Sequence, residues 1–179
     1  SARGGTWNAD GVILFAPGTA SPLVRVPASG GPQVAVTTLA TQNSHRGPSF
    51  LPDGRHFLYY AQGTPDAEGI YLGTLDAPDT HRLTAADAAG VYLQTSLVQR
   101  ASSGLGPAEA SGEGGTRRAE ASGGGGWVLW VRAGTLVAQR LDLARAALTG
   151  DPVTLADAVA VDPSINAAAV SASASGLVA

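Results

Sequence analysis

The sequence predicts an all-β protein built from repeated units of four antiparallel strands, and three observations lead to that prediction. Short apolar runs alternate with turn signals rich in Pro, Gly and Asp at even spacing along most of the chain. The dipeptide Asp10-Gly11 recurs 43 positions later as Asp53-Gly54, and four-stranded propeller blades repeat every ~40–45 residues. The runs VILFA (12–16) and FLYYA (57–61) are apolar throughout, so each is expected to be covered on both faces. The predicted fold class is therefore a partial β-propeller of about three to four blades.

The first predicted unit covers about residues 4–39, and the second covers about residues 45–84. Each contains four predicted strands separated by turns, and the Gly of each Asp-Gly pair can take the positive φ that a tight hairpin needs. In the first unit the strands are expected at 6–8, 12–16, 23–28 and 33–39; in the second, at 48–52, 56–61, 70–76 and 80–84.

The third predicted unit covers about residues 89–160 and is interrupted by a Gly-rich insert at about 96–126. Between Arg100 and Gly126 there are nine glycines, and Leu105 is the only large apolar residue. Because such a segment buries too little surface to offset its ordering entropy, we expect it to be disordered. The strands of this unit are expected at 91–93, 127–131, 135–142 and 152–159, and a fourth unit is expected to start at about 162–179 with a strand at 168–176.

Composition excludes several function classes. The net charge is −3 and 14% of residues are charged, so we expect no nucleic-acid partner and no membrane contact by this segment. The chain has no Cys, which excludes disulfides and thiolate metal sites, and no cofactor is expected. It also has no Met and starts and ends abruptly, so we expect a fragment of a larger protein, whose export signal would lie in the missing sequence.

No residue pattern predicts catalysis or a metal centre. His45, His56 and His81 lack zinc-like short spacing and have no acidic cluster beside them. Asp10 and Asp53 occupy the same predicted hairpin corner of two units, where an Asp side chain bonds its own backbone. We therefore expect no catalytic residue and no metal ligand in this segment.

Loops at one edge of the predicted blades form the candidate binding surface. The connectors 41–46 and 162–166, and the loops 18–21 and 63–68, are expected to open on one rim, opposite the Asp-Gly hairpins. The candidate partner-binding residues are polar or charged side chains of these segments: Asn43, His45, Arg46, Asp66, Glu68, Asp162 and Asn166. The expected partners are a protein or small-molecule ligand on this rim and the remaining blades of the same parent chain.

Seven stretches that together cover nearly the whole chain, except the insert, carry a family resemblance. They are GGTWNADGVILFAP, PLVRVPASGG, SHRGPSFLPDGRHFLYYA, GIYLGTLD, WVLWVRAGTLVAQRLD, LTGDPVTLADAV and VSASASGLVA. The chain resembles TolB-type, WD40-like β-propeller repeats, particularly those C-terminal to bacterial serine/threonine protein kinases of the acidobacterial type. In that family a kinase domain and a membrane span precede a propeller outside the membrane. The resemblance implies a sensing or protein-interaction module with an extracytoplasmic location, periplasmic or cell-surface.

Two features depart from that family: the insert, and fewer than four complete blades where closed rings usually have six or more. The chain has no Lys and no kinase motif, so this segment does not itself transfer phosphate. One alternative is the propeller of a prolyl-oligopeptidase-type peptidase, which needs a Gly-x-Ser-x-Gly elbow in further sequence; another is a TolB-like periplasmic scaffold. Because an incomplete arc leaves its end blades uncovered, we expect the chain alone to be marginally stable or to self-associate.

Overall fold

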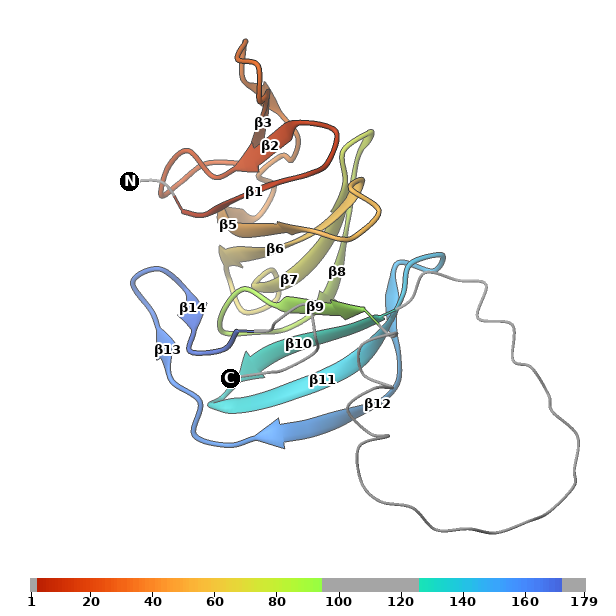
Figure 1. The fold of residues 1–179 in the computed structure, drawn as a ribbon. Coiled ribbons are helices and arrows are strands. Elements are labelled where there is room, and N and C mark those ends of the chain that lie inside the picture. The colour runs from red at the N-terminus through yellow and green to blue at the C-terminus, as the bar shows by residue number, and fades with distance from the viewer. Residues whose placement is uncertain (1–2, 95–125, 172–179) are drawn as a thin grey trace, which may run out of the picture.

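The computed structural model describes residues 3–94 and 126–171, and every regular element in these residues is a β-strand. The strands form three antiparallel sheets of four strands each, followed by a two-stranded hairpin. Within each four-stranded sheet, neighbouring strands are also consecutive along the chain (Figure 1). The all-β prediction is therefore confirmed. The predicted disordered insert lies almost wholly outside the described residues, as does the end of the predicted fourth unit.

The first sheet consists of short strands: β1 (Gly5–Trp7), β2 (Val12–Phe15), β3 (Val24–Pro27) and β4 (Val34–Ala35). A tight turn joins β1 to β2. The side-chain Oδ1 of Asn8 accepts a hydrogen bond of 2.8 Å from the backbone N of Val12, and Gly11 has a φ of 74°. Because Gly adopts that conformation without steric cost, the Asp-Gly pair determines where this hairpin turns.

The second sheet consists of β5 (Gln42–Phe50), β6 (His56–Gly63), β7 (Gly69–Thr74) and β8 (Ala77–Thr84). The segment 41–46 was predicted to be a connector, and that prediction is wrong for most of it. Arg46 pairs with Tyr60, and the ladder continues until Gln42 pairs with Gly63. The reason is that β6 runs on to Gly63 and offers backbone partners along its whole length. Two register shifts, one of them between Arg46 and Ser49, fit the longer strand onto its neighbour.

The third sheet consists of β9 (Val91–Gln94), β10 (Gly126–Arg132), β11 (Thr135–Asp142) and β12 (Ala147–Ala156). The first three strands lie where the sequence predicts them. The fourth begins at Ala147 rather than at residue 152, because the preceding turn is short. In that turn Asp142 Oδ1 accepts a hydrogen bond of 3.1 Å from the backbone N of Arg145, and Ala146 has a φ of 49°.

The second sheet is covered on both faces, as the apolar run 57–61 predicts. Successive residues of β6 alternate between two hydrophobic clusters, one shared with the first sheet and one shared with the third. The first cluster contains Leu14, Ala16, Leu23, Phe57, Tyr59, Ala61 and Tyr71. The second contains Leu51, Leu58, Ile70, Leu72, Ala86, Val128, Trp130 and Leu141. Burial of each large side chain contributes about 1.5–3 kcal/mol, so these two interfaces hold the stack together.

The corresponding prediction for the first sheet is wrong among the described residues. Leu14 and Ala16 are buried against the second sheet, whereas Ile13 and Phe15, on the other face, are only half-buried. The reason is the position of this sheet at one end of the stack (Figure 1).

At the other end, the chain turns back over the third sheet. β13 (Val161–Asp162) pairs with β14 (Ala167–Ala168), so the predicted connector 162–166 is largely the turn of a hairpin. Val161, Ala168 and nearby apolar side chains pack on the face of the third sheet formed by Leu129, Val131, Leu136 and Ala138. This hairpin caps the stack.

Candidate functional site

Segments of the predicted rim meet at one end of the strands of the second sheet. The start of β5 lies there because Gln42 pairs with Gly63, at the end of β6. The Asp53-Gly54 turn lies at the opposite end of these strands, next to the pair Phe50–Phe57. The rim and the Asp-Gly hairpin therefore lie at opposite ends of these antiparallel strands, as predicted.

Arg46 is the centre of a polar network at the rim. Arg46 is only 7% exposed, and its guanidinium donates hydrogen bonds to acceptors from four places in the chain. The acceptors are Ser44 Oγ at 3.0 Å, Asn166 Oδ1 at 2.5 Å, the Thr19 carbonyl at 3.4 Å and the Gln62 side-chain oxygen. Desolvation, with a smaller contribution from the charge of Arg3, lowers the pKa of Arg46 below its usual value. The network satisfies the buried cation with neutral acceptors.

Asn166 connects this arginine to two further elements. It is 8% exposed and has a φ of 52°, a left-handed conformation that Asn tolerates better than most residues. Its backbone carbonyl accepts a hydrogen bond of 3.2 Å from Ala89 N, and its side-chain nitrogen lies 3.5 Å from both Tyr60 Oη and the Asp87 carbonyl. The hairpin turn is thereby tied to the second sheet and to the segment that leads into the third.

Glu68 joins the network through Tyr60, whose hydroxyl donates a hydrogen bond to the Glu68 carboxylate. Burial, together with the neighbouring Glu68 charge, raises the pKa of Tyr60, so the phenol stays protonated. This contact holds the end of the β6–β7 loop next to β7.

His45 lies on the same strand but faces the first sheet. It is 1% exposed; its Nδ1 lies 2.7 Å from Thr37 Oγ1, and its ring centroid lies 4.7 Å from that of Tyr59. Burial lowers the pKa of His45 to about 4, and its Nε2 has no hydrogen-bond partner within the described part of the chain. This residue was predicted on an exposed connector, and the structure places it in the interior because strand β5 extends through it.

The remaining predicted residues, Asn43, Asp66 and Asp162, are exposed. Asp162 Oδ1 accepts hydrogen bonds from Ser164 N at 2.8 Å and Ser164 Oγ at 2.6 Å, which lower the pKa of that carboxyl. Arg3 donates a hydrogen bond of 2.6 Å to the Ser164 carbonyl. The structure thus brings together the buried Arg46 and Asn166 and the half-buried Glu68, and the exposed carboxylates of Asp66 and Asp162 and the amide of Asn43 lie outside them.

Sequence reasoning missed three members of the network: Arg3, Tyr60 and Gln62. Tyr60 and Gln62 are two positions apart in β6 and so lie on one face. A tyrosine inside an apolar strand needs a partner for its hydroxyl, and that was the available signal. Nothing in the local sequence pointed to Arg3.

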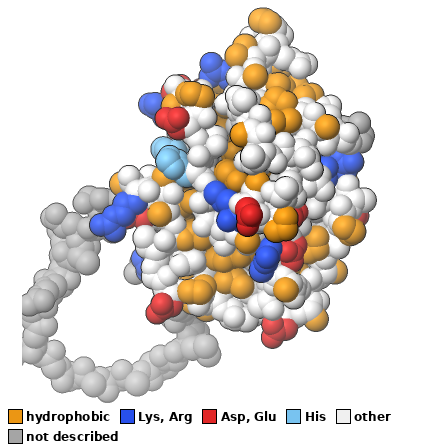
Figure 2. Space-filling view, turned by 180° about the vertical axis from the view of Figure 1, so that it is seen from behind, with side chains coloured by type: hydrophobic (Ala, Val, Ile, Leu, Met, Phe, Trp, Pro, Cys, Tyr) orange, Lys and Arg blue, Asp and Glu red, His pale blue; other side chains and the backbone are white. Residues whose placement is uncertain are grey.

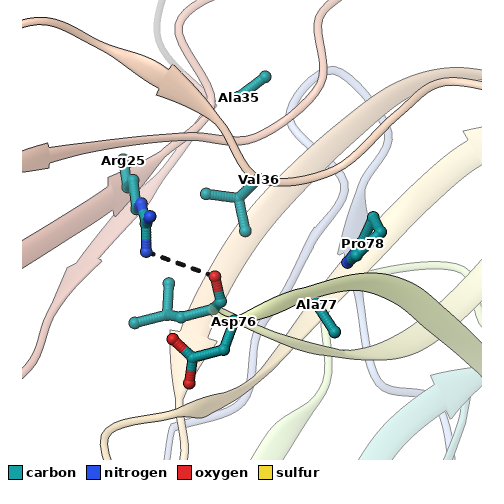
Figure 3. A pocket seen from close by; sticks show the side chains of 7 residues that line it. Arg25, Ala35, Val36, Asp76, Ala77 and Pro78 are labelled. Carbon is teal, nitrogen blue, oxygen red and sulfur yellow. Dashed lines mark hydrogen bonds between the residues drawn. The ribbon is translucent and has the colours of Figure 1, made fainter.

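Two crevices open between neighbouring sheets at the β7–β8 and β11–β12 turns, away from the rim. The first holds about 190 Å³ and lies between the first and second sheets (Figure 3). Arg25 donates a hydrogen bond of 3.3 Å to the Leu75 carbonyl there, and Asp76 forms an ion pair of 2.6 Å with Arg55.

The second crevice, of about 270 Å³, lies between the second and third sheets and is lined in part by His56, Asp79 and His81. His56 Nδ1 lies 2.5 Å from Asp53 Oδ2. Within residues 3–94 and 126–171, no group of three or more histidine and acidic side chains is placed to hold a metal ion. No helix in that same part of the chain is long and apolar enough to cross a bilayer.

Comparison of the chain with protein-family models, curated proteins and solved structures gives no significant match. The TolB-type resemblance therefore rests on the residues quoted above and stays a prediction. What the structure adds is a rim whose loops are fixed from beneath by hydrogen bonds.

Proposed function

We propose that this chain is a non-catalytic sensing or protein-interaction module, formed by blades of a β-propeller, and that its partner binds the rim supported by Arg46. Three consecutive four-stranded antiparallel sheets, stacked face to face, support the propeller assignment. The TolB-type resemblance supports its placement at the extracytoplasmic C-terminal end of a bacterial serine/threonine protein kinase.

The observation that carries the binding role is the network of Arg46, Asn166, Tyr60 and Glu68. It fixes a strand start, a loop and a hairpin turn that come from distant parts of the chain. Loops held in one geometry lose little conformational entropy when they bind, which favours recognition.

The exposed side chains of the rim suggest the chemistry of the partner. Asp66 and Asp162 are exposed carboxylates, whereas Arg46 is buried and already bonded. The two arginines beside these carboxylates are also engaged, since Arg82 donates hydrogen bonds to the Pro65 and Glu68 carbonyls and Arg3 donates one to the Ser164 carbonyl. A partner segment that presents Lys or Arg side chains complements this surface.

Selection of a displayed peptide library on the purified chain tests the proposal. We expect enriched peptides to be basic, and Asp66→Asn and Asp162→Asn each to weaken their binding by about two- to fivefold at low salt. Asp79→Asn removes an exposed carboxylate in the second crevice and serves as the matched control, with binding unchanged. Selected peptides whose binding responds to Asp79→Asn but not to the rim variants would contradict the rim assignment.

The attachment to a kinase has its own test. The flanking open reading frame is expected to encode a kinase domain and a membrane span upstream. A downstream Gly-x-Ser-x-Gly elbow would instead favour the peptidase alternative, and an upstream signal peptide without a kinase would favour the scaffold.

A further inference from the structure

The first two sheets each begin with a hairpin that turns at an Asp-Gly pair, and the two turns are in contact. Asn8 Nδ2 in the first turn donates a hydrogen bond of 2.7 Å to the carbonyl of Gly54 in the second. The glycine has a positive φ in both turns, 74° at Gly11 and 67° at Gly54. Both aspartates are exposed. Figure 2 shows acidic side chains at several separate places on one face of the molecule, so exposure alone does not distinguish these two.

The Asp53 carboxylate is engaged by its own turn. Its Oδ1 accepts hydrogen bonds of 2.9 Å from the backbone N of Arg55 and of His56, and its Oδ2 lies 2.5 Å from His56 Nδ1. Partial burial acts to raise the pKa of Asp53, but the hydrogen bonds from His56 and Arg55 outweigh it and lower that pKa. The carboxylate is therefore kept ionised and is directed towards residues 55 and 56.

In the first turn Asn8 replaces the aspartate in this role. Its Oδ1 accepts a hydrogen bond of 2.8 Å from the backbone N of Val12, which lies two residues after Asp10 as Arg55 lies two residues after Asp53. Within residues 3–94 and 126–171, no hydrogen bond or ion pair holds the Asp10 carboxylate. The side chain of Asp10 is therefore free to turn back towards the amide of the glycine that follows it.

The first hairpin also opens more easily than the second. Gly11 N donates a hydrogen bond of 3.2 Å to the Asn8 carbonyl, whereas Gly54 N donates a shorter one of 2.9 Å to the Leu51 carbonyl. Strands β1 and β2 have three and four residues, whereas β5 and β6 have nine and eight. A short hairpin in the end sheet of the stack has few ladder bonds to break, so its local opening costs less free energy than that of the central sheet.

An Asp-Gly pair can react with itself, because glycine has no side chain to block the approach of its backbone N to the preceding carboxyl group. The nitrogen of Gly11 attacks Cγ of the protonated Asp10 side chain. The N–H proton and the carboxyl hydroxyl leave as water, and a succinimide ring closes. Water then adds to one ring carbonyl and breaks its C–N bond. Addition at Cγ restores aspartate, whereas addition at the main-chain carbonyl gives isoaspartate, with the backbone running through Cβ and Cγ and the α-carboxylate free. One water is released and one is taken up, so the reaction balances with solvent alone.

We propose that Asp10-Gly11 is a self-modification site, at which Asp10 isomerises to isoaspartate through a succinimide, and that the fold protects Asp53-Gly54 from the same reaction. The extra backbone atom changes the geometry of the first hairpin, so the hydrogen bonds of Asn8 to Val12 and Gly54 are lost. Modification therefore loosens the first sheet on the second. It does so at the end of the strands opposite the rim, and the network around Arg46 stays in place.

Incubation of the folded chain at neutral pH in water labelled with ¹⁸O tests the proposal, because hydrolysis of each succinimide incorporates one labelled oxygen. Trypsin, added after return to ordinary water, cleaves after Arg and separates the two pairs into peptides 4–25 and 47–55, each with a single Asp. Peptide 4–25 is expected to gain label and to split into chromatographic isomers. Its labelling should be at least about tenfold faster than that of 47–55, since one hydrogen bond to a charged carboxylate is worth about that factor.

Two controls assign the reaction to this residue and to the fold. Asp10→Glu keeps an exposed carboxylate but would have to close a larger ring, so the label in peptide 4–25 should disappear while the circular dichroism spectrum stays unchanged. In concentrated urea neither turn persists, and the two peptides should label at similar rates.

Three results would overturn the proposal. Equal labelling of the two peptides in the folded chain, or faster labelling of 47–55, would mean that the bonds of Asp53 give no protection. A preference for 4–25 that persists in urea would show that the fold does not produce it. Label that remains in 4–25 of Asp10→Glu would place the reaction at Asn8 instead.

Discussion

The guanidinium of Arg46 donates a hydrogen bond of 2.5 Å to the side-chain oxygen of Asn166, which lies 120 positions further along the chain. This contact joins the first strand of the second sheet to the turn of the terminal hairpin. A charge-assisted hydrogen bond between two nearly buried side chains is stronger than an ordinary one, and loss of either partner leaves the other unsatisfied. The stack is therefore linked at the rim as well as through its apolar faces.

Replacing Asn166 with Ala is expected to lower the free energy of unfolding by about 1–3 kcal/mol, because Arg46 loses one of its buried acceptors. Urea denaturation measures this, and the Ala89 amide, which bonds the Asn166 carbonyl, should exchange faster with solvent. Asn166→Gly keeps the left-handed backbone accessible and separates the loss of the side chain from backbone strain. Asn43→Ala, at an exposed position, is the control and should change stability little. Equal effects of Asn43→Ala and Asn166→Ala would contradict the network.

His45 makes stability depend on pH. Its pKa is about 4 in the folded protein and 6.5 when unperturbed, because burial disfavours the cation. As the pH falls from 6.5 towards 4, His45 becomes protonated in the unfolded chain but stays neutral in the folded chain, so the free energy of unfolding decreases. The loss approaches about 3 kcal/mol and levels off below pH 4. Urea denaturation across this pH range should show a shallower slope for His45→Gln than for the parent chain; identical slopes would mean that His45 titrates normally.

Gly69 cannot be replaced by a residue with a side chain. A Cβ at this position would lie 2.1 Å from the Thr84 carbonyl oxygen, and Gly69 has a φ of 148°. We expect Gly69→Ala to destabilise the protein by more than about 3 kcal/mol, because the backbone of β8 must move. Gly18→Ala is the matched control, since a Cβ there meets nothing closer than 3.8 Å. Thermal unfolding should show a large shift for the first variant and almost none for the second.

Two neighbouring residues of β2 should respond differently to truncation. Leu14 is fully buried between the first and second sheets, whereas Ile13 faces outward and is half-buried. Leu14→Ala is expected to cost about 2–5 kcal/mol through the cavity it leaves, and Ile13→Ala clearly less in dilute monomer. Chemical denaturation of both variants at low protein concentration compares the two faces directly. A larger loss for Ile13→Ala would mean that the outer face is covered within the monomer.

The four-stranded units could be predicted from the sequence because the signals that specify them are local. Asp-Gly at a tight turn and apolar runs such as 57–61 act within a few residues, and they located most strands correctly. The boundaries of β5 and β12 could not be predicted, because a strand continues for as long as its neighbour offers backbone partners.

The candidate site, too, could be predicted from the sequence only in part. Loop composition pointed to the rim, and the exposed positions of Asn43, Asp66 and Asp162 agree with it. The burial of His45 and Arg46, in contrast, follows from the lengthened β5 and from the sheets packed on either side of it.

The sequence by itself thus determined the strands, their order and the doubly apolar run at the centre of the second sheet. Only the tertiary structure decided which polar side chains meet at the rim and which sheet face is left uncovered by the described residues. The physical reason is that turn and strand preferences are properties of neighbouring residues. The contact between Arg46 and Asn166, and the exposure of Trp7, depend instead on how many sheets stack and where the chain turns back over them.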